Sequence, residues 1–163
     1  MNAAVLKPHA SELTGVDLSG KMIAVAREKK LYDRLETEDI IRFCEKNQGV
    51  FDFIVMADVA CYFGRLDLLI QAAGKALKEN GSLFISIENL AGEREYALLP
   101  SGRFAHSRQY LENTLKSAGF EKMKLTSTPL RREKDGVIEG VVAVGEKNGK
   151  ENDSNLDNEN ENV

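Results

Sequence analysis

The chain has 163 residues, of which 42% are apolar and 29% are charged, as expected for one globular domain. Its formal charge of -4 comes entirely from the segment that begins at Glu146, which holds six acids and two lysines. The rest of the chain is neutral, which argues against nucleic-acid binding through phosphate neutralisation. The sequence has no apolar run of membrane-spanning length and no signal peptide at its start, so we expect a cytoplasmic protein that does not bind membranes.

The potential metal ligands are few and widely spaced. The two cysteines, Cys44 and Cys61, stand alone, and His9 and His106 are the only histidines. This spacing favours neither a disulfide framework nor a zinc site, so we expect no metal.

Residues 148–163 contain almost nothing apolar. Such a segment cannot offset its ordering entropy by burial, so we predict a disordered acidic tail. It is more readily interpreted as a solubilising extension than as an interaction arm. Residues 1–147 then form a single folded domain.

Strand-like and helix-like segments alternate along the first part of that domain. Residues 13–18 are predicted to form a strand, and Ser19 then caps a helix over residues 20–30. A second short strand follows at residues 34–38. The apolar run at residues 51–56 is typical of a strand that is buried on both faces.

The same alternation continues along the second part. An apolar stripe predicts a helix over residues 65–79, closed by Asn80 and Gly81, and a strand follows at residues 82–87. Ser107 caps a helix that reaches Ala118 and ends at Gly119. Two final strands are predicted as a hairpin, residues 122–130 and 137–145, flanking Lys134, Asp135 and Gly136.

This order of elements predicts an α/β fold with a mostly parallel sheet, helices on both faces and an antiparallel hairpin at the C-terminal end. Open sheets of this kind bind ligands at the carboxyl ends of their strands. The loops to search are therefore residues 17–19, 39–40, 57–59 and 88–89.

Three acids stand at successive strand ends. Asp17 is placed to accept hydrogen bonds from a ribose diol, although it is also interpretable as an ordinary acid beside a helix. Asp39 suits an adenine amino group about as well as it suits a turn that bonds its own backbone. Asp58 ends the third strand, and the three acids together are a more specific pattern than any one of them.

The chain resembles class I S-adenosyl-L-methionine-dependent methyltransferases, whose sheet is Rossmann-like. Residues 101–107 further resemble a subgroup of predicted methyltransferases that often carry tetratricopeptide repeats, which this sequence lacks. The resemblance covers nearly all of the domain and is carried by residues 13–29, 38–40, 51–59, 80–86 and 117–120.

The resemblance implies roles for individual residues in holding the cofactor. Asp17 would hold the ribose hydroxyls, and Leu18 and Met22 would lie near the adenine. Asp39 would accept from the adenine amino group, and Ile40 would cover the ring. Beside the methionine part and the transferred methyl would lie Asp58 with its neighbours Ala57 and Val59.

One part of the family pattern is missing. A first strand and a glycine-rich loop should precede Leu13 by twenty-odd residues, but no glycine stands before that position. The chain is therefore expected to begin inside the domain, without the strand that normally lies at the centre of the sheet. Its neighbours would then pair directly, or another chain would fill the gap, or the fold would be weak. Self-association through unpaired strands is a further expectation.

The candidates for catalysis and substrate binding each have a structural alternative. His106 is placed to act as a general base, but a histidine at the start of a helix is favoured. Arg103 would bind an acidic substrate group or be a solvated loop arginine, and Tyr96 would line a pocket or pack. Cys61 is assigned to the core, and the Arg131–Arg132 pair to a solvent-facing hairpin.

The sequence thus predicts methyl transfer to a nitrogen, oxygen or carbon nucleophile on a small molecule. The alternative is a truncated relative without catalytic activity that serves as a binding or partner subunit. A nicotinamide dehydrogenase ranks lower, because it would not explain the position of Asp39 or the closing hairpin.

Overall fold

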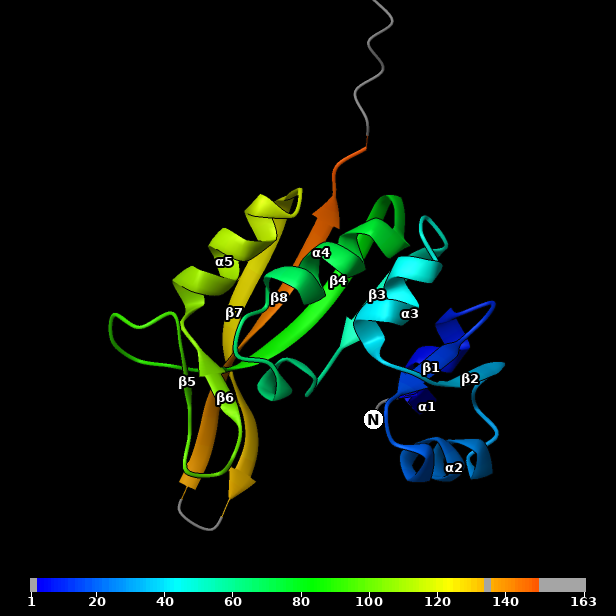
Figure 1. Ribbon diagram of the computed structural model, residues 1–163, viewed down its shortest axis with the longest axis horizontal. Helices are drawn as coiled ribbons and strands as arrows, with labels where there is room; N and C mark the ends of the chain where they lie inside the picture. Colours follow the sequence, from blue (N-terminus) through cyan, green and yellow to red (C-terminus); the bar gives the residue numbers. More distant parts are fainter. Residues whose placement is uncertain (1–2, 134–135, 150–163) are drawn as a thin grey trace, which may run out of the picture.

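The computed structural model describes residues 3–133 and 136–149, and its strands form two separate sheets (Figure 1). The smaller sheet lies in an N-terminal lobe and consists of β1 (Thr14–Asp17) and β2 (Arg34–Thr37), paired in parallel. The lobe also contains α1 (Ala3–Leu6), η1 (Lys7–His9) and α2 (Gly20–Glu28). Helix α2 connects the two strands, as expected for parallel neighbours.

The larger sheet has six strands. They are β3 (Phe51–Met56), β4 (Leu77–Asn89), β5 (Tyr96–Leu98), β6 (Phe104–His106), β7 (Phe120–Glu133) and β8 (Gly136–Lys147). Their order is β5-β6-β4-β8-β7, with β3 paired to β4. Strand β4 is parallel to β3 and β6, but the pairs β4/β8, β5/β6 and β7/β8 are antiparallel. The α/β class is confirmed, whereas a mostly parallel sheet is wrong for these strands because β5 and the long hairpin add antiparallel pairs.

Three helices cover the front face of the six-stranded sheet in Figure 1: α3 (Ile40–Lys46), α4 (Asp67–Ala76) and α5 (Arg108–Ser117). The short helix η2 (Ala60–Tyr62) follows β3. Alternate residues of β4 point to this face and are fully buried under α4 and α5. This core includes Leu83, Ile85, Ile87, Leu69, Ile70, Leu111, Leu115, Phe120 and Ala143.

The opposite face of the sheet is partly exposed. Val55 pairs with Phe84, which pairs in turn with Val144, so these apolar residues form a row across three strands. Val55 and Val144 are 36% and 40% exposed, and Phe53 on the same face of β3 is 46% exposed. Burial of residues 51–56 on both faces is therefore a wrong prediction. No helix of the described chain covers this part of the sheet.

Several element boundaries agree with the sequence, but the helix predicted over residues 65–79 and the strand predicted at 82–87 differ from α4 and β4, and helix α3 was not predicted. The Ser19 and Ser107 side chains accept hydrogen bonds from the Met22 and Tyr110 amides, which confirms both helix caps. The helix predicted over residues 65–79 instead ends at Ala76. The residue with a left-handed backbone after this helix is Asn80, with φ of 60°. Glycine is required at position 81 because a Cβ there would lie 2.9 Å from the Lys78 carbonyl oxygen.

The C-terminal hairpin is present and longer than predicted. Strands β7 and β8 pair in an antiparallel arrangement and include the predicted residues 122–130 and 137–145. The turn residues Lys134 and Asp135 and the greater part of the predicted tail, residues 150–163, lie outside the described residues. Within the described part, no helix is both long and apolar enough to span a membrane.

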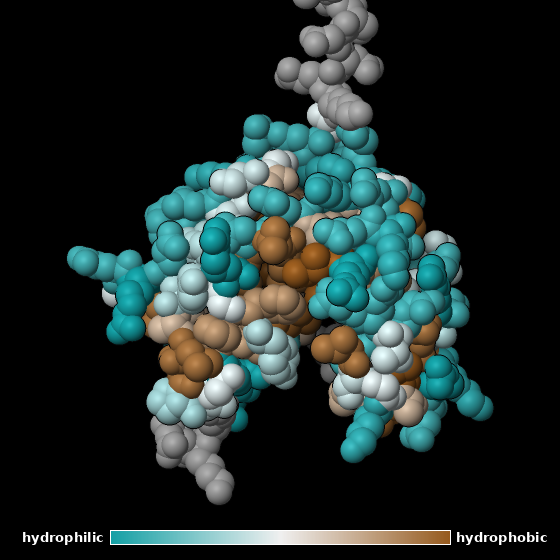
Figure 2. Space-filling view, in the orientation of Figure 1, coloured by the Kyte–Doolittle hydropathy of each residue, from teal (hydrophilic) through white to brown (hydrophobic). Residues whose placement is uncertain are grey.

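A break in the sheet separates the lobe from the rest. Strands β1 and β3 do not pair, and no other described strand is hydrogen-bonded between them. Figure 2 shows the molecule hollowed between the lobe and the larger sheet, with hydrophobic side chains gathered where the two meet. Direct pairing of the strands that end at Asp17 and Asp58 is thus excluded for this structure.

Candidate functional site

The predicted binding loops follow strands of the same direction. Asp17 is the last residue of β1, Asp39 follows β2 and Asp58 follows β3. Glu88 and Asn89 are the last two residues of β4, which is parallel to β3. The predicted loops therefore lie at carboxyl ends of strands, but the first two acids stand at strand ends of one sheet and the last two at strand ends of the other.

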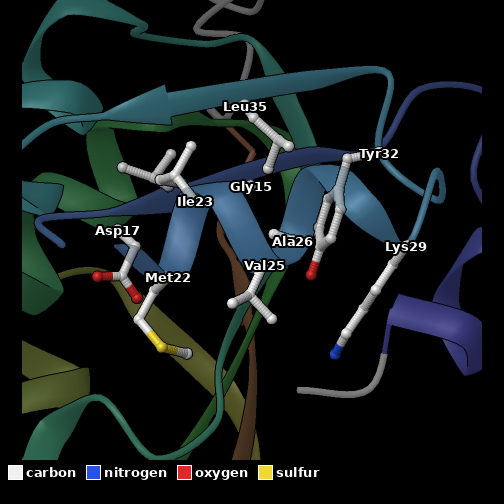
Figure 3. Close-up of a pocket in the computed structure, with 10 residues that line it drawn as sticks. Gly15, Asp17, Met22, Ile23, Val25, Ala26, Lys29, Tyr32 and Leu35 are labelled. Atoms are coloured by element: carbon white, nitrogen blue, oxygen red, sulfur yellow. The ribbon is translucent and has the colours of Figure 1, made fainter. Parts of the chain in front are cut away.

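Asp17 lies at the end of a shallow pocket between α2 and β1 (Figure 3). One carboxylate oxygen, Oδ1, accepts a hydrogen bond of 2.8 Å from the Ser19 amide, which leaves Oδ2 for another donor. Met22 lies beside Asp17 and is 50% exposed, and Leu18 is 74% exposed. The pocket volume is about 30 Å³, which is small beside the roughly 300 Å³ or more of ordinary ligand pockets, so the pocket alone does not enclose a nucleoside.

Asp39 caps helix α3. Its Oδ1 accepts hydrogen bonds of 3.1 Å from the amides of Ile41 and Arg42. The capping alternative is thus present, and it occupies only one of the two carboxylate oxygens. Ile40 is partly buried and packs against the main core, so only part of its side chain is available to cover a ring.

Asp58 has an unusual backbone. Its φ of 62° lies in the left-handed region, which favours Asn, Asp or Gly among short residues. Its amide donates to the Ser86 hydroxyl at 3.1 Å, and its side chain is 64% exposed. Of its neighbours, Ala57 is exposed and Val59 is half-buried. The residue is therefore held by its backbone while its carboxylate faces outward.

Four charged side chains meet next to this loop, and we call them the charge cluster: Asp58, Glu88, Arg103 and Arg131. Glu88 accepts hydrogen bonds from Arg103 Nε and, at 2.8 Å, from Arg131 Nη2. Asp58 accepts from Arg103 Nη2 and lies 3.9 Å from Arg131 Nη1. Arg103 therefore bridges the two carboxylates, and its guanidinium also lies 5.5 Å from the centre of the Tyr62 ring.

Opposing effects act on the ionisation of the charge cluster. Burial raises the pKa of Glu88, but the hydrogen bonds from Arg103 and Arg131 outweigh it and hold that pKa below its ordinary value. The Arg103 pKa is raised, because its bonds to Glu88 and Asp58 outweigh the effect of burial. Glu88 and Arg103 are therefore both charged at neutral pH.

His106 is fully buried and holds the loop that carries Asp58. Its Nε2 lies 2.9 Å from the carbonyl oxygens of Phe63 and Gly64, so this nitrogen carries the hydrogen and donates. Nδ1 is buried without a hydrogen-bond partner among the described residues. The ring stacks on Tyr110, with centroids 6.0 Å apart and planes inclined by 13°. This arrangement favours the structural alternative for His106 over a general base.

Stability should depend on pH through His106. Burial lowers its pKa below the ordinary value, against the opposing effect of the two carbonyls. Below about pH 6.5, His106 is protonated in the unfolded chain but stays neutral in the folded chain. The free energy of unfolding should therefore fall as the pH drops. The slope is at most about 1.4 kcal/mol per pH unit. Urea unfolding at pH 8 and pH 5.5 measures how much the free energy of unfolding changes with pH. An equal change in His106→Gln would show that His106 is not the group responsible.

Tyr96 belongs to an aromatic group beside His106. Its ring centre lies 6.3 Å from that of Phe104, 6.2 Å from His106 and 5.9 Å from Tyr110. Tyr96 is half-buried, so it packs while keeping part of its surface open. Both alternatives for this residue therefore remain compatible with its position.

The cysteines are buried thiols. Burial raises the pKa of both Cys44 and Cys61 to about 11, so both are protonated at neutral pH. Cys61 lies within 3.5 Å of the Asp58 carbonyl oxygen. Its assignment to the core is confirmed by its burial.

Two members of the charge cluster were not singled out from the sequence. Arg131 is not on a solvent-facing surface as predicted, because β8 pairs with β4 and β7 pairs with β8, so Arg131 of β7 reaches Glu88 of β4 across β8. Glu88 is 4% exposed, and an acid at the end of an apolar strand was the only signal for it. Arg103 is ion-paired and mostly buried, so it is not a solvated loop arginine.

The comparisons with known proteins identify a family from the sequence and a shared fold from solved structures. The sequence profile described as a methyltransferase domain matches residues 1–125. A SAM-dependent methyltransferase from Methanosarcina mazei has a similar structure, with a TM-score of 0.71, 17% identity, and coverage of 91% of this chain and 87% of that one.

A second structure with the same fold is the 1,6-didemethyltoxoflavin-N1-methyltransferase of Burkholderia thailandensis, which contains 1,6-didemethyltoxoflavin and S-adenosylhomocysteine. It has a TM-score of 0.62 and 14% identity, and the match covers 90% of this chain and 76% of that one. No curated protein matches the sequence. The profile match covers most of the chain, and the chain therefore belongs to the methyltransferase domain family, whose methyl donor is S-adenosyl-L-methionine.

Proposed function

We propose that this domain transfers a methyl group from S-adenosyl-L-methionine to a nitrogen, oxygen or carbon nucleophile of a small molecule. The observation that carries the proposal is Asp17, which ends β1 within the stretch matched by the family profile and keeps one carboxylate oxygen for a ligand. When bound, the cofactor would supply a methyl group attached to a sulfonium. The neutral thioether that remains after transfer is a good leaving group. The protein's task is then alignment and exclusion of water.

The residues present fit the adenosine half of the cofactor. Asp17 offers Oδ2 to the ribose hydroxyls, and Asp39 offers Oδ2 to the adenine amino group. Leu18 and Met22 offer exposed apolar surface to the base, with Ile40 beside them in the proposal. For the methionine half we propose Ala57, Asp58 and Val59. Tyr96 and Arg103 would face the methyl acceptor. His106 would position the loop that carries Asp58.

We further propose that a strand and glycine-rich loop, supplied from outside the described residues, complete the sheet between β1 and β3. Two observations support this: the adjacent strands do not pair, and Phe53 and Val55 of β3 are substantially exposed. Unpaired backbone N–H and C=O groups lower stability once they are buried. A strand inserted there would form hydrogen bonds with the free edges of both β1 and β3. Glycines in the following loop would let backbone amides approach the cofactor closely.

The break in the sheet also favours a second candidate function. Without the inserted strand, the domain would be a partner subunit that associates through the free edge of β3, with no catalytic role of its own. Cofactor binding separates the two functions, since a partner subunit need not bind S-adenosylhomocysteine.

Asp17→Ala should weaken the binding of S-adenosylhomocysteine at least tenfold in a form that carries the additional strand and loop. The substitution removes charge-assisted hydrogen bonds to the ribose, each worth roughly 1.5–3 kcal/mol. Calorimetric titration measures the affinity. Asp52→Ala is the matched control, because Asp52 pairs with Lys78 near the opposite end of β3. Equal affinities in a folded Asp17→Ala protein and its control would refute the assignment.

A further inference from the structure

The charge cluster is arranged asymmetrically. Its inner members are Glu88, which is 4% exposed, and Arg103 and Arg131, whose side chains are 18% and 28% exposed. Asp58 is the outer member and is 64% exposed. One carboxylate thus lies beneath two guanidiniums, and the second carboxylate covers them from the solvent side.

The contacts of Arg103 make its guanidinium a fixed group. Its Nε donates to the buried Glu88, and its Cζ lies over the Tyr62 ring, 5.5 Å from the ring centre. These contacts do not involve Asp58, so they would remain if the Asp58 side chain turned away. Nη2 of Arg103 would then lose its acceptor and could donate to another group.

The Asp58 side chain can rotate while its backbone stays fixed. Its main chain is fixed through the hydrogen bond of its amide to Ser86, whereas its side chain is exposed and reaches the arginines through Oδ1 alone. Rotation of the side chain would therefore leave the loop in place. An external carboxylate or phosphate could then accept from the same donors, since a guanidinium suits either group.

We propose that Arg103, with Arg131 beside it, is the subsite for an anionic group of the methyl acceptor, and that Asp58 occupies this subsite in the present structure. The acceptor would accordingly be a small molecule with a carboxylate or phosphate near its nucleophile. The acceptor part of this proposal rests on the proposed methyl transfer. The anion subsite itself is testable without turnover.

The test removes the charge that competes for the subsite. Asp58→Asn keeps a residue that tolerates a φ of 62° and replaces the carboxylate by an amide. Asp52→Asn is the matched control, because it makes the same charge change at an exposed aspartate that pairs with Lys78. Acetate and inorganic phosphate are titrated separately at constant ionic strength, and the Arg103 Nε–H resonance is followed by NMR.

Asp58→Asn should bind at least one of the two anions about fivefold or more tightly than the unchanged protein and Asp52→Asn. Which anion gains more identifies the acceptor group as a carboxylate or a phosphate. The gain should disappear in Asp58→Asn with Arg103→Met. If Asp58→Asn binds both anions no more tightly than Asp52→Asn, the subsite proposal is overturned. The titration contains no cofactor, so its failure would leave the proposed methyl transfer standing, and a lack of methyl transfer would leave the anion subsite standing.

Discussion

A form of the protein that carries a strand and glycine-rich loop ahead of Met1 is expected to bind S-adenosylhomocysteine at least about a hundredfold more tightly than the 163-residue chain. The described residues provide acids and apolar groups for the adenosine half, but the break between β1 and β3 leaves the proposed site for the methionine half open on one side. Two charge-assisted hydrogen bonds to backbone amides would account for this difference, because each contributes roughly 1.5–3 kcal/mol.

Calorimetric titration of both forms measures this difference, and light scattering on the same samples reports their association. The shorter chain should also self-associate, because the free edge of β3 and the exposed Phe53 and Val55 invite strand pairing. A matched control carries the same strand with valines in place of the loop glycines, which restores the sheet but blocks the close approach of the backbone. Micromolar binding by a monomeric 163-residue chain would show that the added strand is not needed.

The sequence predicted most of the elements because their signals are local. Serine caps at Ser19 and Ser107 and the left-handed Gly119 depend on neighbours within one turn, and the structure has all three. The apolar run at residues 51–56 gave the bounds of β3 correctly. Its burial on the second face depends on which elements lie against that face, and a local pattern does not contain this information.

Several missed elements and residues depend on contacts distant in sequence, whereas the short helix α3 was missed although its cap, Asp39, is local. Strands β5 and β6 are only three residues each and form because β6 pairs with the end of β4. Arg131 reaches Glu88 across 43 positions because the long hairpin returns along β4. Neither contact follows from periodicity or from a motif, and both require the sheet order to be known.

The site was predicted in part for the same reason. Strand ends are local features, so Asp17, Asp39 and Asp58 could be named as candidates. The partners of their side chains are partly distant: Asp39 bonds its own helix, whereas Asp58 bonds Arg103 from a segment 45 positions away. The sequence therefore indicated these three acids as candidates, but not the ion pair of Asp58 with Arg103.

Glu88→Ala should lower the free energy of unfolding by about 2–4 kcal/mol, the largest stability effect expected within the charge cluster. The substitution removes a carboxylate that is 4% exposed and leaves Arg131 and the Nε of Arg103 without the acceptor that holds them. Urea unfolding measures the loss. Glu36→Ala is the control, because Glu36 is also on a strand and pairs with an arginine, but at a more exposed position where about 0–1 kcal/mol is expected.

The contribution of Glu88 should also disappear in acid. Burial acts to raise its pKa, but the two arginines outweigh burial and keep the pKa below that of an unfolded glutamate. The stabilisation is therefore fully present above about pH 4.3 and is lost as the pH falls through the lower pKa of the folded state. The difference in unfolding free energy between the unchanged protein and Glu88→Gln should shrink below pH 4. A difference that stays constant from pH 7 to pH 3 would mean that Glu88 does not hold the arginines through its charge.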